Sequence, residues 1–173
     1  ERLANDDVPE AASQAGSPRP FTVGRLSRDA LDKHNPEDPM LYRMLASRGI
    51  RVRIMGGTCL APALEGVEGV DLLPAGAESA TDFYRSLDLF LYRTGASTEA
   101  YGRVIVEAMA SALPVVACRR GGYVEVIDHG VNGFLFRSQE EAHDLVMSLR
   151  LSAHRRRSAG EAAMATATDI HGP

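Results

Sequence analysis

Residues 99–117 read EAYGRVIVEAMASALPVVA, and the fold is most clearly interpreted outward from this stretch. From about Gly102 the stretch has the composition of a helix that is apolar almost all round. Such a helix has no polar face to turn towards water, so it is expected to lie buried between a sheet and other elements. The apolar run from Pro114 to Cys118 then predicts a short strand.

Short apolar runs alternate with helical patterns through most of the chain. The runs that predict strands are Phe21 to Leu26, Val52 to Met55, Val70 to Leu73, Leu87 to Tyr92 and Pro114 to Cys118. Asp38 is expected to cap a helix that has Pro39 at its first position and ends before Gly49. Two later helices have capping-box patterns, Ser79 with Asp82 and Ser138 with Glu141. The alternation predicts an α/β fold, namely a Rossmann-like doubly wound parallel sheet.

The chain of 173 residues is long enough for one domain with a sizeable core. Residues 1–20 have the composition of a linker or disordered lead-in. We expect the folded domain over residues 21–157, with its last clear helix ending near Arg150. Residues 158–173 are rich in Ala and Thr and are expected to form a frayed helix, a tail or a cut end.

Charge and composition exclude several function classes. The formal net charge of −4 argues against a nucleic-acid partner, which needs a basic face. Apolar runs are far shorter than the roughly 20 residues that cross a bilayer, so we expect a cytoplasmic location with at most peripheral membrane association. Cys59 and Cys118 lack neighbouring metal ligands and are expected to be reduced core thiols. The five histidines are expected to be structural or at the surface, and no metal site is predicted.

Glu107 is a carboxylate within the apolar helix. Burying an ionised carboxylate is costly unless hydrogen-bond donors meet it, so either an internal arginine or a ligand hydroxyl should pair with it. The helix follows the strand that ends at Tyr92, and ligands of parallel sheets gather at the carboxyl ends of strands. That position favours a sugar or ribose diol as the partner of Glu107.

Glu99 lies in a loop of small residues that leads into the amino terminus of the same helix. Free amides and the helix dipole favour a phosphate at such a terminus. Anion and diol contacts would then adjoin each other. Considered alone, two glutamates eight positions apart are a weak signal, and a solvated loop residue is the ordinary alternative for Glu99.

The stretch from Glu99 to Ala117 closely resembles the family 4 glycosyltransferases, whose donor-binding domain carries two Glu separated by seven residues. Tyr101-Gly102 after the first Glu, the sequence EAMA at 107–110 and the sequence PVV at 114–116 all fit that family's pattern. Further similarities are Val23 to Leu26 with Lys33, and the segments 121–127 and 129–134, which resemble the family's closing turn and hairpin. One departure is Ala112, where the family usually has Gly and where a methyl group should disturb the helix end.

The resemblance assigns roles to individual residues. It implies that Glu99 contacts the donor sugar near the reacting carbon and that Glu107 binds the ribose hydroxyls. The amides of Tyr101, Gly102 and Arg103 would hold sugar or diphosphate. Arg25 and Lys33 would neutralise the diphosphate, and Lys33 is the only lysine among 19 Lys and Arg residues.

Alternatives to the phosphate roles stay open at this point. Arg25 at a strand end is also compatible with a salt bridge, and Lys33 with a solvated loop. The interval between these two residues is longer than in the commoner family loop. Arg28 therefore competes with Lys33 for the phosphate.

The resemblance implies the carboxyl-terminal half of a two-domain GT-B enzyme. It would transfer a hexose-type sugar from a nucleoside-diphosphate sugar to a glycan or lipid acceptor with retention. Arg25, Lys33 and the helix amino terminus would stabilise the leaving diphosphate without a metal or other cofactor. An amino-terminal acceptor-binding domain would be missing, so the isolated chain should transfer little. A nucleotide-sugar 2-epimerase and a non-catalytic nucleotide-sugar-binding module are the alternatives, and the nucleotide, sugar, acceptor, linkage and oligomeric state are left open.

Overall fold

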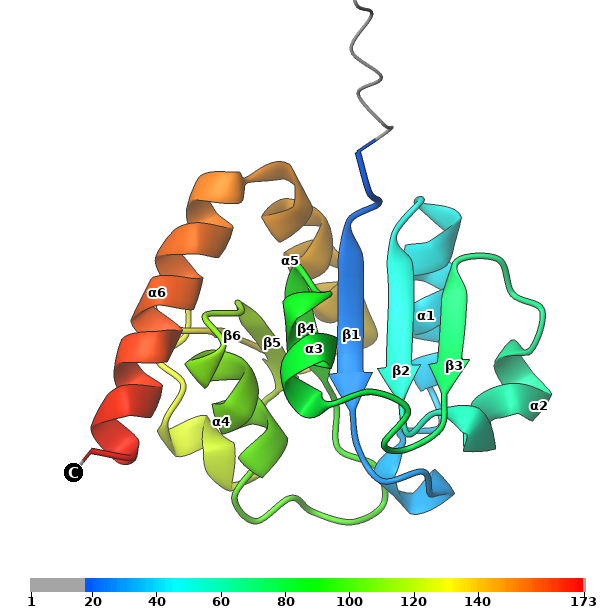
Figure 1. Cartoon of the computed structure of the whole chain (residues 1–173), viewed down its shortest axis with the longest axis horizontal. Helices are drawn as coiled ribbons and strands as arrows, with labels where there is room; N and C mark the ends of the chain where they lie inside the picture. The colour runs from blue at the N-terminus through cyan, green and yellow to red at the C-terminus, as the bar shows by residue number, and fades with distance from the viewer. Residues whose placement is uncertain (1–17, 173) are drawn as a thin grey trace, which may run out of the picture.

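The computed structural model describes residues 18–172 and contains one parallel sheet. Its six strands lie in the order β3-β2-β1-β4-β5-β6 (Figure 1). Their bounds are β1 Thr22–Leu26, β2 Arg51–Met55, β3 Val70–Leu73, β4 Leu89–Tyr92, β5 Val115–Cys118 and β6 Phe134–Phe136. The predicted doubly wound parallel sheet is confirmed, and the expected lead-in at 1–17 lies outside the described residues.

Helices cover both faces of the sheet, with α1 and α5 on one face and α3 and α4 on the other (Figure 1). The bounds are α1 Asp38–Ser47, α2 Ala61–Leu64, α3 Ala80–Arg85, α4 Arg103–Ala110, α5 Gln139–Leu151 and α6 Ala153–Ile170. Three short 3-10 helices are η1 Leu31–Lys33, η2 Thr58–Leu60 and η3 Gly122–Glu125. Every residue of β4 and β5 is buried, as expected of parallel strands covered on both faces.

All five predicted strands are present, but β6 was not predicted, and the segment before it differs from the expected hairpin. The resemblance implied a hairpin at residues 129–134. Instead, His129 and Gly133 form an isolated bridge, and β6 pairs in parallel with β5. The three residues of β6 are too few for a periodic signal in the sequence.

Two of the three predicted helix caps are confirmed. The hydroxyl oxygen of Ser79 accepts the Asp82 N–H at 3.1 Å, and that of Ser138 accepts the Glu141 N–H at 3.2 Å. Asp38, however, is the first helical residue and not the cap, which is Glu37. Its carboxylate is buried and binds Arg93 and the Asn35 N–H, so a tertiary ion pair has replaced the capping role.

Residues 158–173 were expected to form a frayed helix, a tail or a cut end, and the structure shows a helix over most of them that crosses the expected domain end at residue 157. Helix α6 runs unbroken to Ile170 and packs against α4. Its buried residues Ala159, Gly160, Ala163 and Ala167 recur every three or four positions and form a narrow stripe of small side chains. A small-residue stripe has low hydrophobicity, which is why composition alone suggested a tail. None of the helices that the structure describes is long and apolar enough to cross a lipid bilayer.

Ala112, between α4 and β5, has a positive φ of 57°. A residue with a Cβ atom is strained there by about 1–2 kcal/mol, whereas glycine is not. Alanine thus occupies a position that favours glycine, while the Leu113 N–H still closes the helix end on the Ala108 carbonyl at 3.2 Å, so the expected disturbance of the helix end stays a prediction. The Ala112 side chain is exposed.

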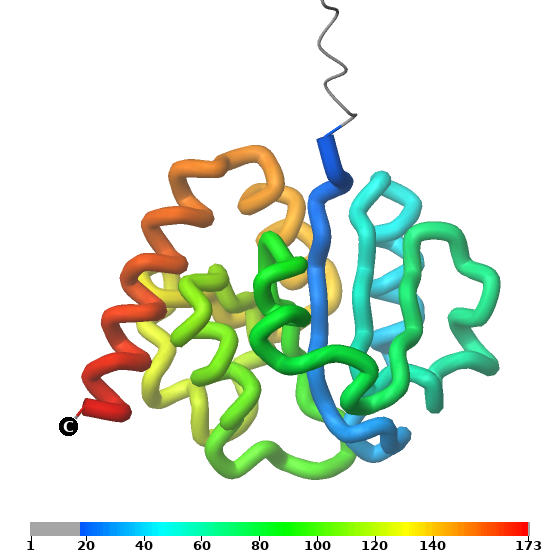
Figure 2. The backbone as a smooth tube through the Cα atoms, viewed as in Figure 1, coloured from blue at the N-terminus to red at the C-terminus, as the bar shows by residue number. Residues whose placement is uncertain are grey.

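The carboxyl ends of all six strands meet at one edge of the sheet, where the chain reverses its winding direction between β1 and β4. The segment after β1 leads to α1 on one face, and the segment after β4 leads to α4 on the other (Figure 1). Both segments lie at the same carboxyl edge (Figure 2). Ligands of open α/β sheets bind at such a switch point.

Candidate functional site

The loop after β4 is tied directly to η1. The Ala96 N–H donates to the Asp32 carbonyl at 3.0 Å. Gly95 makes this approach possible, because a Cβ atom there would lie 2.2 Å from the Asp32 oxygen and 2.8 Å from the His34 nitrogen. Two segments more than 60 residues apart in the sequence are thereby held together at the switch point.

Glu99 and Lys33 meet as a result of this contact. The Lys33 Nζ atom lies 3.8 Å from Glu99 Oε2, with the two side chains 20% and 26% exposed. The Glu99 carboxylate also accepts the Gly102 N–H at 3.3 Å and the Tyr92 hydroxyl at 3.4 Å. Glu99 is therefore not a freely solvated loop residue, and Lys33 is not a solvated one either.

Tyr92 was not among the predicted site residues, although it is the last residue of β4. Burial raises its pKa to about 12, with the Arg25 charge opposing the rise and Glu99 adding to it. The hydroxyl therefore stays protonated and donates to the carboxylate at neutral pH. The only feature of the sequence that could have indicated this hydrogen bond to Glu99 is the position of Tyr92 at the carboxyl end of a strand.

The backbone of Glu99 is fixed from the other side by Gly122. The Gly122 N–H donates to the Glu99 carbonyl at 3.1 Å, and a Cβ atom on Gly122 would lie 1.8 Å from the Ala100 oxygen. Close backbone packing at Gly95 and Gly122 thus fixes the position of the loop near both of its ends. Neither was predicted as a site residue, because close backbone approach is a tertiary property.

Helix α4 begins at this loop with free backbone donors. Gly102 is the cap, with a φ of +73°, and its Cα packs against the Tyr123 ring. Within residues 18–172 the N–H groups of Arg103 and Val104 have no hydrogen-bond partner. Unpaired N–H groups at a helix amino terminus form a site suited to an anion. The Arg103 side chain, by contrast, is 87% exposed, and Tyr101 is 55% exposed.

Glu107 lies one turn further along α4 and is 41% exposed, so it is not the buried carboxylate that the sequence suggested. The hydroxyl of Tyr84 in α3 donates to its Oε2 atom at 3.1 Å, and Arg103 Nε lies 3.6 Å from Oε1. Burial and Glu107 raise the pKa of Tyr84 above its usual range, which keeps this donor protonated. Glu107 thus contacts a tyrosine and a surface arginine, and its half-exposed carboxylate can accept further hydrogen bonds.

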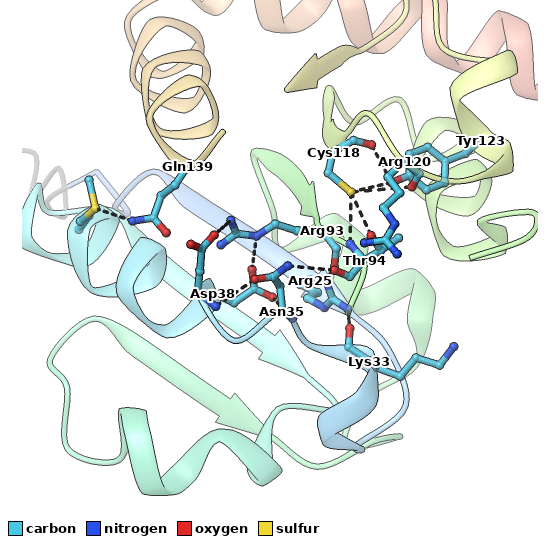
Figure 3. Close-up of polar contacts among 12 residues, drawn as sticks. Arg25, Lys33, Asn35, Asp38, Arg93, Thr94, Cys118, Arg120, Tyr123 and Gln139 are labelled. Carbon is cyan, nitrogen blue, oxygen red and sulfur yellow. Dashed lines mark hydrogen bonds and ion pairs between the residues drawn. The ribbon is translucent and has the colours of Figure 1, made fainter. Parts of the chain in front are cut away.

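Arg25 was expected to contact the diphosphate, but its side chain is buried, with 1% exposure. Its guanidinium donates to the main-chain carbonyls of Arg93 and Lys33 and lies 4.5 Å from the centre of the Tyr92 ring (Figure 3). It forms no ion pair within the described residues, so the alternative of a strand-end salt bridge is wrong. Arg25 places a positive charge behind Lys33 and Glu99, and its buried Nε atom has no hydrogen-bond partner among residues 18–172. Arg28, the competitor of Lys33, is exposed.

Arg93, the residue after β4, forms a buried ion pair with Asp38, with 2.7 Å between Nε and Oδ1 (Figure 3). The pair ties the start of α1 to the end of β4, across the switch point. A buried pair of this kind is costly to break because it leaves one charge alone. Among residues 18–172, His, Cys, Asp and Glu side chains form no group of three placed as they would be around a metal ion.

Comparison with known proteins identifies the family of the chain. The model of the family "Glycosyl transferases group 1" matches residues 18–150, which is most of the chain. The chain belongs to this family. The matched range includes both segments of the switch point and all of the residues that were predicted to bind the donor.

Two curated relatives share part of the sequence. The sulfoquinovosyl transferase SQD2 of Arabidopsis thaliana is 41% identical over 76 residues, which are 42% of this chain and 14% of the relative. The GDP-mannose-dependent alpha-mannosyltransferase of Corynebacterium glutamicum is 40% identical over 60 residues, which are 35% of this chain and 14% of the relative. The match thus covers a small part of each relative's length.

Two solved structures share the fold. Anabaena HepE in complex with UDP-glucose has a TM-score of 0.74 at 24% identity, covering 87% of this chain and 44% of that one. The C-terminal domain of the group 1 glycosyltransferase LpcC from Francisella tularensis has a TM-score of 0.71 at 18% identity, covering 87% of this chain and 86% of that domain. These similarities show the Rossmann-like fold of the GT-B glycosyltransferases.

Proposed function

We propose that the chain is the donor-binding domain of a retaining glycosyltransferase of family 4. It binds a nucleoside-diphosphate sugar and supports transfer of a hexose-type sugar to a glycan or lipid acceptor. The observation that carries the proposal is the meeting of Lys33, Glu99 and the α4 amino terminus at the switch point. The HepE structure, which holds UDP-glucose on the same fold, supports a nucleotide sugar as the ligand.

Each part of the donor has a matching group in this arrangement. The free N–H groups of Arg103 and Val104, with Lys33, suit the diphosphate because they present positive charge to an anion. Glu99 beside them suits hydroxyls of the sugar, and Glu107 suits those of the ribose. Positive groups already in place at the leaving diphosphate stabilise the charge that develops there, so the proposal includes no resident metal or other cofactor.

The rest of the protein's function follows from the proposal. A second, amino-terminal domain would bring the acceptor to the carboxyl edge of the sheet, where the donor lies. Retention implies attack from the face that the diphosphate leaves, with Glu99 orienting the sugar near the reacting carbon. We place the reaction in the cytoplasm, with at most peripheral contact to a membrane.

The proposal can be tested because it gives Glu99 and Glu107 contacts with different parts of the donor. Calorimetry should show that Glu107→Gln weakens UDP and UDP-glucose binding by about the same factor, roughly tenfold for one charge-assisted hydrogen bond. Glu99→Gln should weaken the sugar nucleotide and leave the free nucleotide almost unchanged. Glu125→Gln, a change of an exposed carboxylate at η3, is the matched control. Identical behaviour of all three variants would refute the assignment.

A further inference from the structure

A positively charged pocket lies at the carboxyl ends of β4, β5 and β6, at the same edge of the sheet as the proposed donor site. It has a volume of about 290 Å³, and Arg93, Thr94, Arg119, Arg120 and Arg137 are among its lining residues. These residues follow three neighbouring strands, so the parallel sheet itself brings the arginines together. The proposed donor contacts of Lys33, Glu99 and α4 use none of these arginines.

Among residues 18–172, three of the four arginines that line this pocket have no acidic partner within ion-pair distance. In the described part of the chain, Arg119, Arg120 and Arg137 form no ion pair. Glu37 also lines the pocket, but it already faces Arg93, with 3.3 Å between Glu37 Oε2 and Arg93 Nη1. Arginines gathered without counter-charges repel each other, and a bound anion relieves that repulsion.

Arg93 supplies an independent sign of a missing ligand. Its side chain is 8% exposed, with Nε bound to Asp38 and Nη1 near Glu37. The third nitrogen, Nη2, is buried and has no hydrogen-bond partner among residues 18–172. An unsatisfied buried donor on a cation is costly, and an oxyanion in the pocket would satisfy it.

The pocket and the proposed donor site are linked through Arg25. Its guanidinium donates to the carbonyl of Lys33 on one side and to the carbonyl of Arg93 on the other (Figure 3). Figure 3 also shows Arg120 beside Cys118 and Thr94, on the Arg93 side of this link. One substrate positioned at the carboxyl edge for attack on the donor sugar can therefore reach the pocket with a second group.

We infer that this arginine pocket binds an anionic group, a phosphate or a carboxylate, of the acceptor substrate. Arginine guanidinium groups bind both kinds of oxyanion through paired N–H donors. The anion site stands on the charges and the unpaired Arg93 donor alone. Its assignment to the acceptor rests on the proposed function, because that function places the donor diphosphate at Lys33 and α4.

Backbone-amide NMR spectra of the chain, titrated with inorganic phosphate and separately with sodium acetate at constant ionic strength, test the inference. We expect saturable shifts at Arg119, Arg120 and Arg137, and the anion that binds more tightly identifies phosphate or carboxylate as the natural group. Arg120→Gln should weaken that binding by about tenfold, as expected for loss of a charge-assisted contact. Arg157→Gln removes an equal charge from an exposed position on α6 and should change nothing.

The same titration in the presence of saturating UDP separates this pocket from the donor site. The phosphate or acetate shifts should persist with UDP bound, whereas displacement by UDP would assign the pocket to the donor and overturn the inference. Absence of saturable shifts with both anions, or equal weakening in Arg157→Gln, would also overturn it. Failure of UDP to shift Glu99 and Gly102 would instead count against the proposed function, while leaving the anion shifts intact.

Discussion

Lys33 and Glu99 form a long ion pair between two partly exposed side chains. Their charged atoms are 3.8 Å apart, which is long for a direct ion pair, and both side chains are partly exposed. A partly exposed ion pair of this kind contributes only about 0–1 kcal/mol to stability. Stabilisation of the fold is therefore a weak reason for the chain to place its single lysine here. A diphosphate bound beside Lys33 would replace a weak contact by a strong one.

Lys33→Gln is therefore expected to weaken UDP binding by about tenfold or more and uridine binding hardly at all, because only the former carries phosphate. Arg28→Gln removes the same charge from an exposed position in the same segment and is the matched control. Calorimetry with both ligands makes the comparison. A larger loss in Arg28→Gln would transfer the phosphate role to Arg28.

His34, the residue after Lys33, is a buried structural histidine, as the sequence predicted. Its Nε2 atom lies 2.9 Å from the Gly56 carbonyl, and its exposure is 4%. Burial, followed by the Arg25 charge, lowers its pKa below 6.5, while the Gly56 carbonyl and the carboxylates Asp38 and Asp29 oppose the shift. The folded state therefore favours the neutral ring more than the unfolded state does.

This shift predicts a pH dependence of the free energy of unfolding. Because the unfolded chain binds the proton more readily, the stability from neutral His34 is present above pH 6.5 and is lost as the pH falls towards the folded-state pKa. His34→Gln should be about 1 kcal/mol less stable than wild type at high pH through loss of its hydrogen bond. Urea unfolding should show that difference shrinking in acid. A difference independent of pH would contradict the account.

The arrangement of the proposed site depends most on the loop between β4 and α4, because this loop carries Glu99. It contains no regular structure, and its position depends on two glycines that approach other backbone atoms more closely than any Cβ atom allows. The sequence identified this loop through its small residues and Glu99. It did not predict which segment the loop touches, since that contact joins distant parts of the chain.

Gly95→Ala should separate the loop from η1, because the new Cβ would lie 2.2 Å from the Asp32 oxygen. Loss of the Lys33–Glu99 contact should weaken UDP-glucose binding by about tenfold or more. Gly66→Ala is the control, since it meets no atom within 4 Å and is strained by its φ of +77° alone. If both variants bind the nucleotide sugar as wild type does, the loop does not position the site.

For the helices and strands, the sequence predicted most of the elements but not the residues at which they begin and end. Runs such as Leu89–Tyr92 are apolar and bounded by turn residues, so periodicity was informative. Asp38 was misassigned because a helix start was visible but its ion pair with Arg93 was not. The exposure of Glu107 was misjudged for a related reason, since helix composition does not reveal which side faces solvent.

The whole molecule is a single doubly wound sheet completed by a last helix that the sequence did not define. Helix α6 adds its stripe of small residues to the outer side of α4, the helix that carries Glu107. The domain therefore extends to Ile170 in structural terms. Its final helix supports the site indirectly, by packing on the element that holds one of the two glutamates.

A pair of identical substitutions on α6 tests this extent of the domain. Ala163→Asp should lower the free energy of unfolding by about 3 kcal/mol, because Ala163 is fully buried and the new charge would have no partner. Ala165→Asp, on the exposed side of the same helix, should change it by less than about 0.5 kcal/mol. Urea unfolding measures both. Equal small effects would mean that α6 does not contribute to the fold.

The central claim is that the switch point binds a nucleoside-diphosphate sugar. The most direct measurement is calorimetric titration of the chain with UDP, GDP, ADP and their hexose conjugates, repeated in Glu107→Gln. The account predicts that one nucleotide binds more tightly than the other two and that its affinity falls by about tenfold in the variant. Equal affinity in wild type and Glu107→Gln, or nucleotide binding no tighter than that of inorganic pyrophosphate, would contradict it.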